Sequence, residues 1–335
     1  MKAHRSPIVP TLMLAALASL TACSGANTAL PHAMTAQLVQ SHTATSNTWS
    51  QGAPAPTKQF TGAAAVVGND IYLVGGEIHI EVLNENDIYD TTTNTWTTGK
   101  RMPTRRTALA AVGLNGLVYA IGGETFDGTP LATVEAYDPV SNTWTTKASL
   151  PVPVDSMTAT TANGLIYVVG GLDNSSGQSF NGLQVYDPGT DSWTTAAPLN
   201  VAKAFAYTAA VGDVIVSAGG FVGNGPSLDN EVYDIGTNAW TTKRSMKDFR
   251  YGGCTGSIGG SLYAAEGLKF QPIRGASNRL DAYNVAADRW TELAHVPFAE
   301  IGPASATVNG QLYCIGGSPF FGQPFFSKRL QIYTP

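Results

Sequence analysis

The sequence of 335 residues is poor in charged side chains. Lysine, arginine, aspartate and glutamate make up 13% of it, about half of the roughly 25% that is usual in soluble domains. The formal net charge is −5, which gives no electrostatic reason for binding nucleic acid or an anionic membrane surface. We therefore expect no nucleic-acid partner.

Residues for metal and hydrolase chemistry are also scarce. Of five histidines, only His79 and His295 lie beyond the first 42 residues. No cluster of histidine and cysteine has metal-ligand spacing, and no G-x-S-x-G hydrolase motif occurs. The glycine pairs end strands and precede no helix, which argues against a phosphate-binding loop. We expect no metal and no other cofactor.

Helical periodicity is absent beyond the first 20 residues, and a longer period takes its place. Tryptophan recurs every 47–50 residues, at Trp49, Trp96, Trp144, Trp193, Trp240 and Trp290. A tyrosine lies seven residues before five of them, at Tyr89, Tyr137, Tyr186, Tyr233 and Tyr283. Glycine pairs keep the same period, at 75–76, 122–123, 170–171, 219–220 and 316–317. A fixed period of this length is typical of a repeat architecture.

One period, residues 105–146, predicts four short strands. The expected strands are 107–114, 117–123, 133–139 and 144–146, and Asn115-Gly116 is a strong hairpin signal between the first two. The segments are rich in valine, isoleucine, tyrosine and threonine, as strands prefer. Four antiparallel strands repeated radially form a β-propeller blade.

The succession of Gly-Gly, Tyr and Trp resembles the kelch repeat over residues 47–335. The resemblance implies an all-β, six-bladed propeller, with Gly-Gly ending the second strand, Tyr in the third and Trp in the fourth. Tyr333 is followed by no tryptophan, since the sequence ends at Pro335. We therefore expect residues 302–335 to supply three strands of the last blade and residues 46–51 the fourth, which removes the free edges of an open sheet.

The first 44 residues are predicted to be a processing segment and a tether. Lys2 and Arg5 precede an apolar stretch, 8–20, that is too short to span a membrane. Residues 20–23, Leu-Thr-Ala-Cys, resemble the lipobox of bacterial lipoproteins, which implies a signal peptide at 1–22 and acylation of Cys23; an ordinary signal peptide is the alternative. With Ser24 next, the resemblance implies an exported lipoprotein, which in a Gram-negative cell would be anchored in the outer membrane or face the periplasm. Residues 23–44 are expected to be a flexible tether and 45–335 one propeller domain.

Two further cysteines, Cys254 and Cys314, fall in a first and a second strand of neighbouring blades. Export permits a disulfide, but the spacing across blades favours two buried free thiols.

The face that carries the fourth-to-first and second-to-third connections is the predicted ligand site. A charged residue precedes the first strand of each blade, to within one or two residues of register: Lys58, Arg105 with Arg106, Asp155, Lys203, Arg250 and Glu300. The alternative is that these residues only solvate the entrance.

The second-to-third loops vary most, and variable loops on a rigid scaffold often carry function. Glu77, His79 and Glu81 alternate in the first, and Arg274 lies in the fifth. Four phenylalanines in the sixth, Phe320, Phe321, Phe325 and Phe326, form either a plug over the last blade or an exposed recognition surface; we favour the plug.

Between the pairs at 219–220 and 316–317 the repeat predicts another glycine pair, and Glu266-Gly267 stands in its place. A carboxylate near Arg250 or Arg274 is a candidate acid or base, as is Glu300. The alternative is that a weakened repeat tolerates Glu266 in an exposed loop.

Two functions are compatible with these features. The first is a lipid-anchored module that binds an unidentified protein or glycan of the cell envelope, with the membrane reached only through the lipid. The second is a sugar mutarotase, since the repeat also resembles sialic-acid mutarotases. Glu266 or Glu300 would then act as the acid or base that transfers the proton. The sugar carboxylate would be bound by Arg105, Arg250 or Arg274. Galactose oxidase also resembles this repeat, but the two distant histidines argue against its copper site.

Overall fold

A computed structural model describes residues 46–335, except 80, 174–177, 224, 271–273 and 321–324. The predicted signal peptide, Cys23 and the tether lie outside the described residues. Residues Ala44–Pro335 form one compact unit. In the described part of the chain every regular element is a β-strand, and no helix is present that could cross a membrane.

Six four-stranded antiparallel sheets make up most of the described chain. Blade one consists of β2 (Ala63–Val67), β3 (Asp70–Val74), β6 (Asn86–Asp90) and β7 (Thr95–Thr98). Blade two consists of β8 (Ala110–Leu114), β9 (Leu117–Ile121), β10 (Val134–Asp138) and β11 (Thr143–Thr146), and blade three of β12 (Thr158–Ala162), β13 (Leu165–Val169), β16 (Leu183–Asp187) and β17 (Ser192–Ala196). Blade four consists of β18 (Tyr207–Val211), β19 (Val214–Ala218), β22 (Asn230–Asp234) and β23 (Ala239–Lys243), and blade five of β25 (Cys254–Ile258), β26 (Ser261–Ala265), β29 (Leu280–Asn284) and β30 (Arg289–Glu292).

Blade six joins the two ends of the propeller. Its strands are β31 (Ala304–Val308), β32 (Gln311–Ile315), β33 (Leu330–Thr334) and β1 (Thr48–Gln51). β1 pairs with β33, with Trp49 opposite Tyr333. The predicted closure of the last blade by an N-terminal strand is confirmed.

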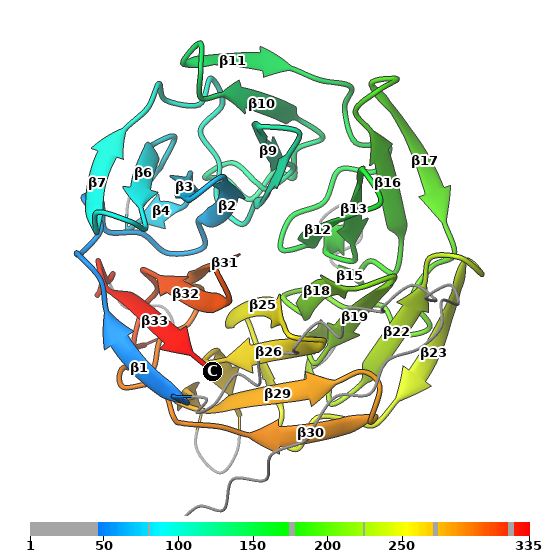
Figure 1. Cartoon of the computed structure of the whole chain (residues 1–335). Helices are drawn as coiled ribbons and strands as arrows, with labels where there is room; N and C mark the ends of the chain where they lie inside the picture. Colours follow the sequence, from blue (N-terminus) through cyan, green and yellow to red (C-terminus); the bar gives the residue numbers. More distant parts are fainter. Residues whose placement is uncertain (1–45, 80, 174–177, 224, 271–273, 321–324) are drawn as a thin grey trace, which may run out of the picture. The chain divides into compact units, whose positions relative to one another are not determined.

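The sheets surround a central axis, with their first strands innermost and their fourth strands outermost (Figure 1). The second-to-third connections of blades one, three and four each contain a small two-stranded sheet. In blade five a three-stranded sheet joins two strands of that connection to a strand that precedes the first strand of the blade. Their strands are β4 (Glu77–Ile78), β5 (Glu81–Val82), β14 (Leu172–Asp173), β15 (Gln178–Ser179), β20 (Phe221–Val222), β21 (Gly225–Pro226), β24 (Arg250–Tyr251), β27 (Leu268–Lys269) and β28 (Gly275–Ala276).

The Trp and Tyr markers hold neighbouring blades together. Each Trp lies opposite its Tyr, with ring centroids 5.0–5.2 Å apart. Each indole N–H also donates to a carbonyl just after the fourth strand of the preceding blade; Trp96, for example, donates to Ala53 at 2.8 Å. The tyrosines of these pairs are buried, and ring pairs with a satisfied indole N–H stabilise both packing and registry.

The glycine pairs hold the blades together nearer the axis. In each blade the N–H at the second glycine position donates to a carbonyl of the next blade, as Gly76 does to Arg106 at 3.0 Å. A side chain at Gly75 would lie 2.6 Å from that same carbonyl oxygen, so the close approach requires glycine.

A closed ring of backbone hydrogen bonds surrounds the axis. Six residues with positive φ take part, and the N–H of each donates to the carbonyl of its counterpart in the preceding blade at 2.7–2.9 Å: Thr61, Ala108, Ser156, Phe205, Gly252 and Gly302. The bond from Thr61 to Gly302 closes the ring. This ring fixes the positions from which the loops of the candidate site start.

The two cysteines of the propeller form a disulfide, so the prediction of free thiols is wrong. Cys254 of β25 and Cys314 of β32 have Cα atoms 5.6 Å apart. The first strand of blade five packs against blade six, where the Thr255 N–H donates to Ser305 Oγ at 3.0 Å. This packing brings together two cysteines that are 60 residues apart.

Candidate functional site

In each blade, one residue shortly before the first strand, which we call the approach residue, forms an antiparallel β-bridge with the residue after the glycine pair. These pairs lie at the end of the axis where the second-to-third connections begin. We call the twelve residues the mouth: Phe60 with Glu77, Thr107 with Glu124, Asp155 with Leu172, Ala204 with Phe221, Tyr251 with Leu268, and Ile301 with Ser318.

Three carboxylates lie in the mouth, on blades one to three. Glu77 and Glu124 are half-buried and Asp155 is buried. Burial raises the pKa of Glu77. Burial, together with the charges of Asp155 and Glu77, raises the pKa of Glu124 to about 7. A carboxyl group with this pKa can both donate and accept a proton near neutral pH.

Aromatic rings occupy the other side of the mouth, on blades four and five. The Tyr251 ring lies 5.7 Å from Phe205, 5.5 Å from Phe221 and 6.0 Å from Phe270, measured between centroids. These three phenylalanines are half-buried, and the Arg274 guanidinium lies 5.1 Å from the Phe270 centroid. The mouth therefore offers carboxylate acceptors on one side and ring faces on the other, a combination of apolar surface and few polar groups that is typical of small-ligand sites.

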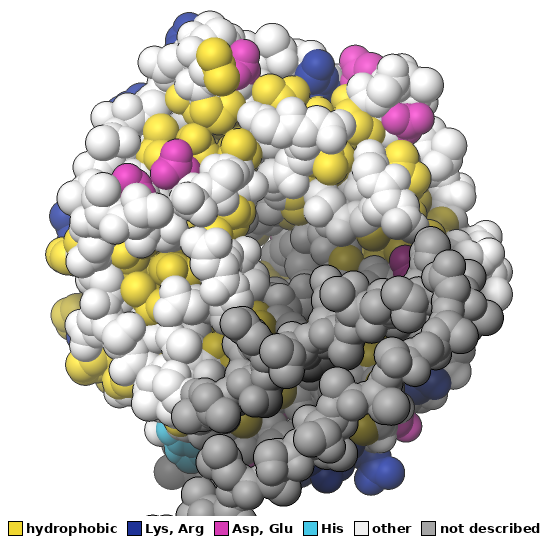
Figure 2. Space-filling model, in the orientation of Figure 1, with side chains coloured by type: hydrophobic (Ala, Val, Ile, Leu, Met, Phe, Trp, Pro, Cys, Tyr) yellow, Lys and Arg dark blue, Asp and Glu magenta, His cyan; other side chains and the backbone are white. Residues whose placement is uncertain are grey.

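A channel follows the axis between the first strands. It has a volume of about 340 Å³ and is lined mainly by alanine, glycine, serine and threonine, without a charged side chain among the described lining residues. On the face shown in Figure 2, the centre is hollowed and the charged side chains lie mainly toward the outer edge of the molecule. The chemistry of the site therefore belongs to the mouth rather than to the channel.

Three of the predicted ligand residues are buried in ion pairs. Each guanidinium or ammonium group contacts a carboxylate on the third strand of its own blade: Arg106 with Glu135 at 2.8 Å, Lys203 with Glu231 at 3.5 Å, and Arg250 with Asp281. The cations are 0–1% exposed. Burial lowers the pKa of Arg106 to about 10, although Glu135 opposes the shift. These pairs lie beneath the mouth and hold its loops; a ligand role for them stays a prediction.

The other charged residues that were predicted to precede the first strands lie in different environments. Lys58 is exposed, and the position equivalent to Arg106 in blade one is Gln59, which is 3% exposed. Arg105 is exposed and binds Glu81. Asp155 is an approach residue of the mouth, as described above. The predicted position before the first strand was therefore one residue too early in blade one, at Lys58, and one residue too late in blade three, at Asp155.

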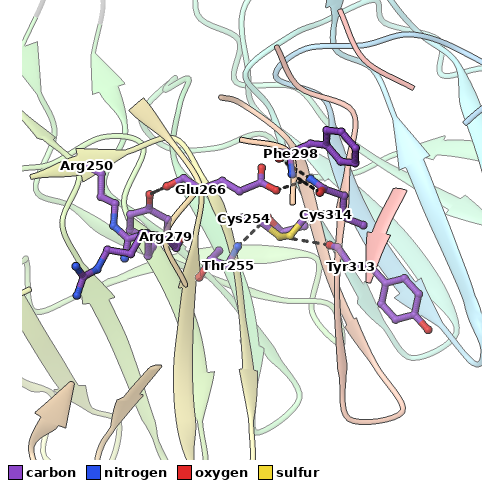
Figure 3. Close-up of a disulfide and its surroundings, with 11 residues drawn as sticks. Arg250, Cys254, Thr255, Glu266, Arg279, Phe298, Tyr313 and Cys314 are labelled. Carbon is purple, nitrogen blue, oxygen red and sulfur yellow. Dashed lines mark hydrogen bonds between the residues drawn. A yellow bond between two sulfur atoms is a disulfide. The ribbon is translucent and has the colours of Figure 1, made fainter. Parts of the chain in front are cut away.

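Glu266 faces the protein interior. It is 0% exposed, and its Oε1 accepts a hydrogen bond from Gln331 Nε2 at 2.8 Å. Its φ is +59°, within the range of +56° to +73° that the equivalent glycines have in the other blades. Burial and the nearby Glu300 hold its pKa well above the usual value. Figure 3 shows this carboxylate pointing toward Phe298, beside the disulfide. The interpretation of an exposed-loop glutamate is wrong.

Glu300 is 1% exposed and binds Arg329 at 2.6 Å. Burial raises its pKa, and the Arg329 charge opposes the shift. Glu266 and Glu300 are both buried, and Arg250 pairs with Asp248 and Asp281 instead. The acid–base role of the two glutamates therefore stays a prediction.

The phenylalanines of the sixth loop divide between packing and exposure. Phe326 stacks on Phe60 with centroids 6.1 Å apart. Phe320 and Phe325 are 59% and 61% exposed, so a plug describes Phe326 but not these two rings. Phe321 lies outside the described residues.

Sequence reasoning missed Glu124. The signal that could have identified it is the repeat itself, because Glu77 and Glu124 both directly follow a glycine pair. Aligning the blades on that pair brings both carboxylates to the same place at the mouth. Within the described residues, no group of three or more His, Cys, Asp or Glu side chains is arranged to hold a metal ion.

The repeated sheets and their glycine, tyrosine and tryptophan contacts define a β-propeller. The chain belongs to the kelch-repeat family, since residues 62–264 match the KLHDC2/KLHL20/DRC7 Kelch-repeats domain. A solved structure described as "Structure of YjhT" is similar in fold, with a TM-score of 0.72 and 19% sequence identity over 82% of this chain and 94% of that one. No curated protein sequence matches the chain.

Proposed function

We propose that this kelch propeller is a lipid-anchored module of the cell envelope that binds a glycan at its mouth. The observation that carries the proposal is the pairing of carboxylates, led by Glu124, with the aromatic group around Tyr251. Carboxylate oxygens accept hydrogen bonds from sugar hydroxyls, and aromatic faces pack against the apolar faces of sugar rings. The anchor rests on the lipobox-like segment before Cys23.

An array of glycans and peptides, probed with the purified full chain, tests the binding. We expect selected glycans to retain the protein, and binding to peptides alone would contradict the proposal. Labelling cells with palmitate tests the anchor: the wild-type chain is expected to take up label and Cys23→Ser is not.

A sugar mutarotase is the second candidate, and the pKa of Glu124 favours it. A group with a pKa of about 7 is suited to transfer the proton between the ring oxygen and the anomeric hydroxyl. Arg274, at the Phe270 edge of the mouth, would hold a sugar carboxylate. The fold similarity to the YjhT structure is compatible with this candidate but does not carry it.

Proton NMR of freshly dissolved α-N-acetylneuraminate tests the mutarotase. The full chain is expected to accelerate anomerisation, and Glu124→Gln to reduce the acceleration by about 10²-fold or more. A wild-type rate equal to that of buffer would eliminate the second candidate and leave the glycan-binding proposal standing.

A further inference from the structure

A second concave site lies where the two ends of the propeller meet. We call it the seam groove: a cavity of about 520 Å³ with Pro54 and Lys58 on one wall and Phe325, Phe326, Lys328 and Arg329 on the other. Its volume is within the range of about 300–1,000 Å³ that small-molecule sites occupy. None of the twelve residues of the mouth is among the described residues that line the groove, although Phe60 of the mouth stacks on Phe326.

The exposed charges of the seam groove are all positive. Lys58, Lys328 and Arg329 are exposed. Glu300, which pairs with Arg329, and Asp87, which interacts with the Lys328 charge, are only 1% and 3% exposed. Arg329 binds Glu300 at 2.6 Å, and Lys328 Nζ donates to the Pro56 carbonyl. Lys58 makes no ion pair with any described residue. Cations at the surface with their counterions buried behind them attract an anion from solvent.

Aromatic faces lie beside these cations. Phe325 is 61% exposed. Phe298 is 39% exposed, and the Arg329 guanidinium lies 4.4 Å from its ring centroid. Stacking on an aromatic ring restricts the orientation of a guanidinium, and the Arg329 side chain is still 42% exposed. Exposed rings gathered around a concavity are typical of a recognition surface rather than of solvated chain.

We propose that the seam groove binds a saccharide that carries a carboxylate, a hexuronate unit in a glycan chain. Arg329 and Lys58 would bind the carboxylate through charge-assisted hydrogen bonds, and the Phe325 face would pack against the apolar face of the sugar ring. The proposal rests on the glycan ligand of the proposed function and adds a second subsite with its own selectivity. A neutral sugar would leave Lys58 without a partner, so the groove would discriminate against it.

Calorimetric titration of the full chain with trigalacturonate and with glucuronate tests the subsite. The comparison ligand is the same trisaccharide with its carboxylates reduced to alcohols. We expect at least one uronate to bind, with an affinity that falls as salt is added, and the reduced trisaccharide to bind at least tenfold more weakly.

Variants locate the site. Lys58→Gln and Phe325→Ser are each expected to weaken uronate binding by about tenfold, the loss of one charge-assisted contact or ring contact. Lys100→Gln, an exposed lysine on blade one, is the matched control and is expected to bind as the wild type does.

Three outcomes would overturn the inference: no binding of either uronate, equal binding of the reduced trisaccharide, or a wild-type uronate affinity in both Lys58→Gln and Phe325→Ser. Each of these leaves the proposed function standing if the array identifies a glycan. An array without any glycan signal would instead remove the proposed function itself.

Discussion

Glu266 has a backbone conformation that glycine supplies in the other five blades. Its φ is +59°, which costs a residue with a side chain about 1–2 kcal/mol. Its carboxyl group is buried, and one of its oxygens, Oε2, has no hydrogen-bond partner among the described residues. A buried carboxyl group in this environment favours its protonated form in the folded state.

The substitution Glu266→Gln tests this environment. Because burial raises the folded-state pKa of Glu266 above its usual value of 4.5, the wild type loses stability as pH rises above that value, by about 1.4 kcal/mol per pH unit until the folded-state pKa is reached. Urea unfolding at pH 5 and pH 8 is expected to show similar stabilities at pH 5 and a more stable variant at pH 8. Asp213→Asn, at an exposed turn, is the control. A difference between Glu266→Gln and wild type that does not change with pH would contradict the account.

Among single residues, the sequence identified the charged positions before the first strands but not the side chains with which they pair. Arg106 was predicted to face a ligand, whereas its guanidinium donates to the Thr133 carbonyl at 2.7 Å and to Glu135. Glu135 lies 29 residues away, and no local pattern shows that the two side chains share the interior of one blade. Glu124, in contrast, could have been found by aligning the repeats on their glycine pairs.

At the scale of the elements, the strands could be predicted because each repeat carries its own signals. The expected strand 117–123 corresponds to β9 (Leu117–Ile121), and Asn115-Gly116 forms the turn before it. The relation between strands of different blades could not be predicted. Cys254 and Cys314 show this, since the register between two neighbouring blades determines whether two sulfur atoms meet.

The disulfide is expected to stabilise the junction of blades five and six. It links residues with a sequence separation of 60, for which the loss of chain entropy in the unfolded state is worth about 4 kcal/mol. Urea unfolding of the double variant Cys254→Ser, Cys314→Ser is expected to give a free energy of unfolding lower by about that amount. Reduction of the wild type in the same assay is the check on the substitutions themselves. Unchanged unfolding in both experiments would show that the link does not stabilise the ring.

At the scale of the whole molecule, the closure by β1 joins the start and end of the propeller. Asn47 Oδ1 accepts hydrogen bonds from the Ala294 N–H at 3.0 Å and from Tyr333 at 2.8 Å. Trp49 Nε1 donates to the Ala294 carbonyl at 2.8 Å. The phase of the tryptophans in the sequence predicted this closure, because the last repeat has a tyrosine and no tryptophan after it.

Deletion of residues 45–52 tests the closure against deletion of residues 25–43. The first deletion removes β1 and the packing of Trp49, a loss of about 3–5 kcal/mol for the tryptophan alone. It is expected to lower the Tm by about 10 °C or more, while the second leaves the Tm close to that of the full chain. Equal melting temperatures for the two deletions, measured by differential scanning calorimetry, would refute the closure.

The function proposed for the whole molecule depends on the mouth. Kelch blades set its geometry, but the carboxylates after the first two glycine pairs and the rings around Tyr251 set its chemistry, and neither belongs to the repeat signature. The sequence could therefore predict the scaffold more fully than the site.

The most direct measurement is a calorimetric titration of the best glycan from the array into the wild type, Glu124→Gln and Asp213→Asn. We expect a dissociation constant at least tenfold higher for Glu124→Gln, because a carboxylate contact in the mouth is lost, and a wild-type value for Asp213→Asn. Equal affinities of all three proteins would contradict a glycan site at the mouth.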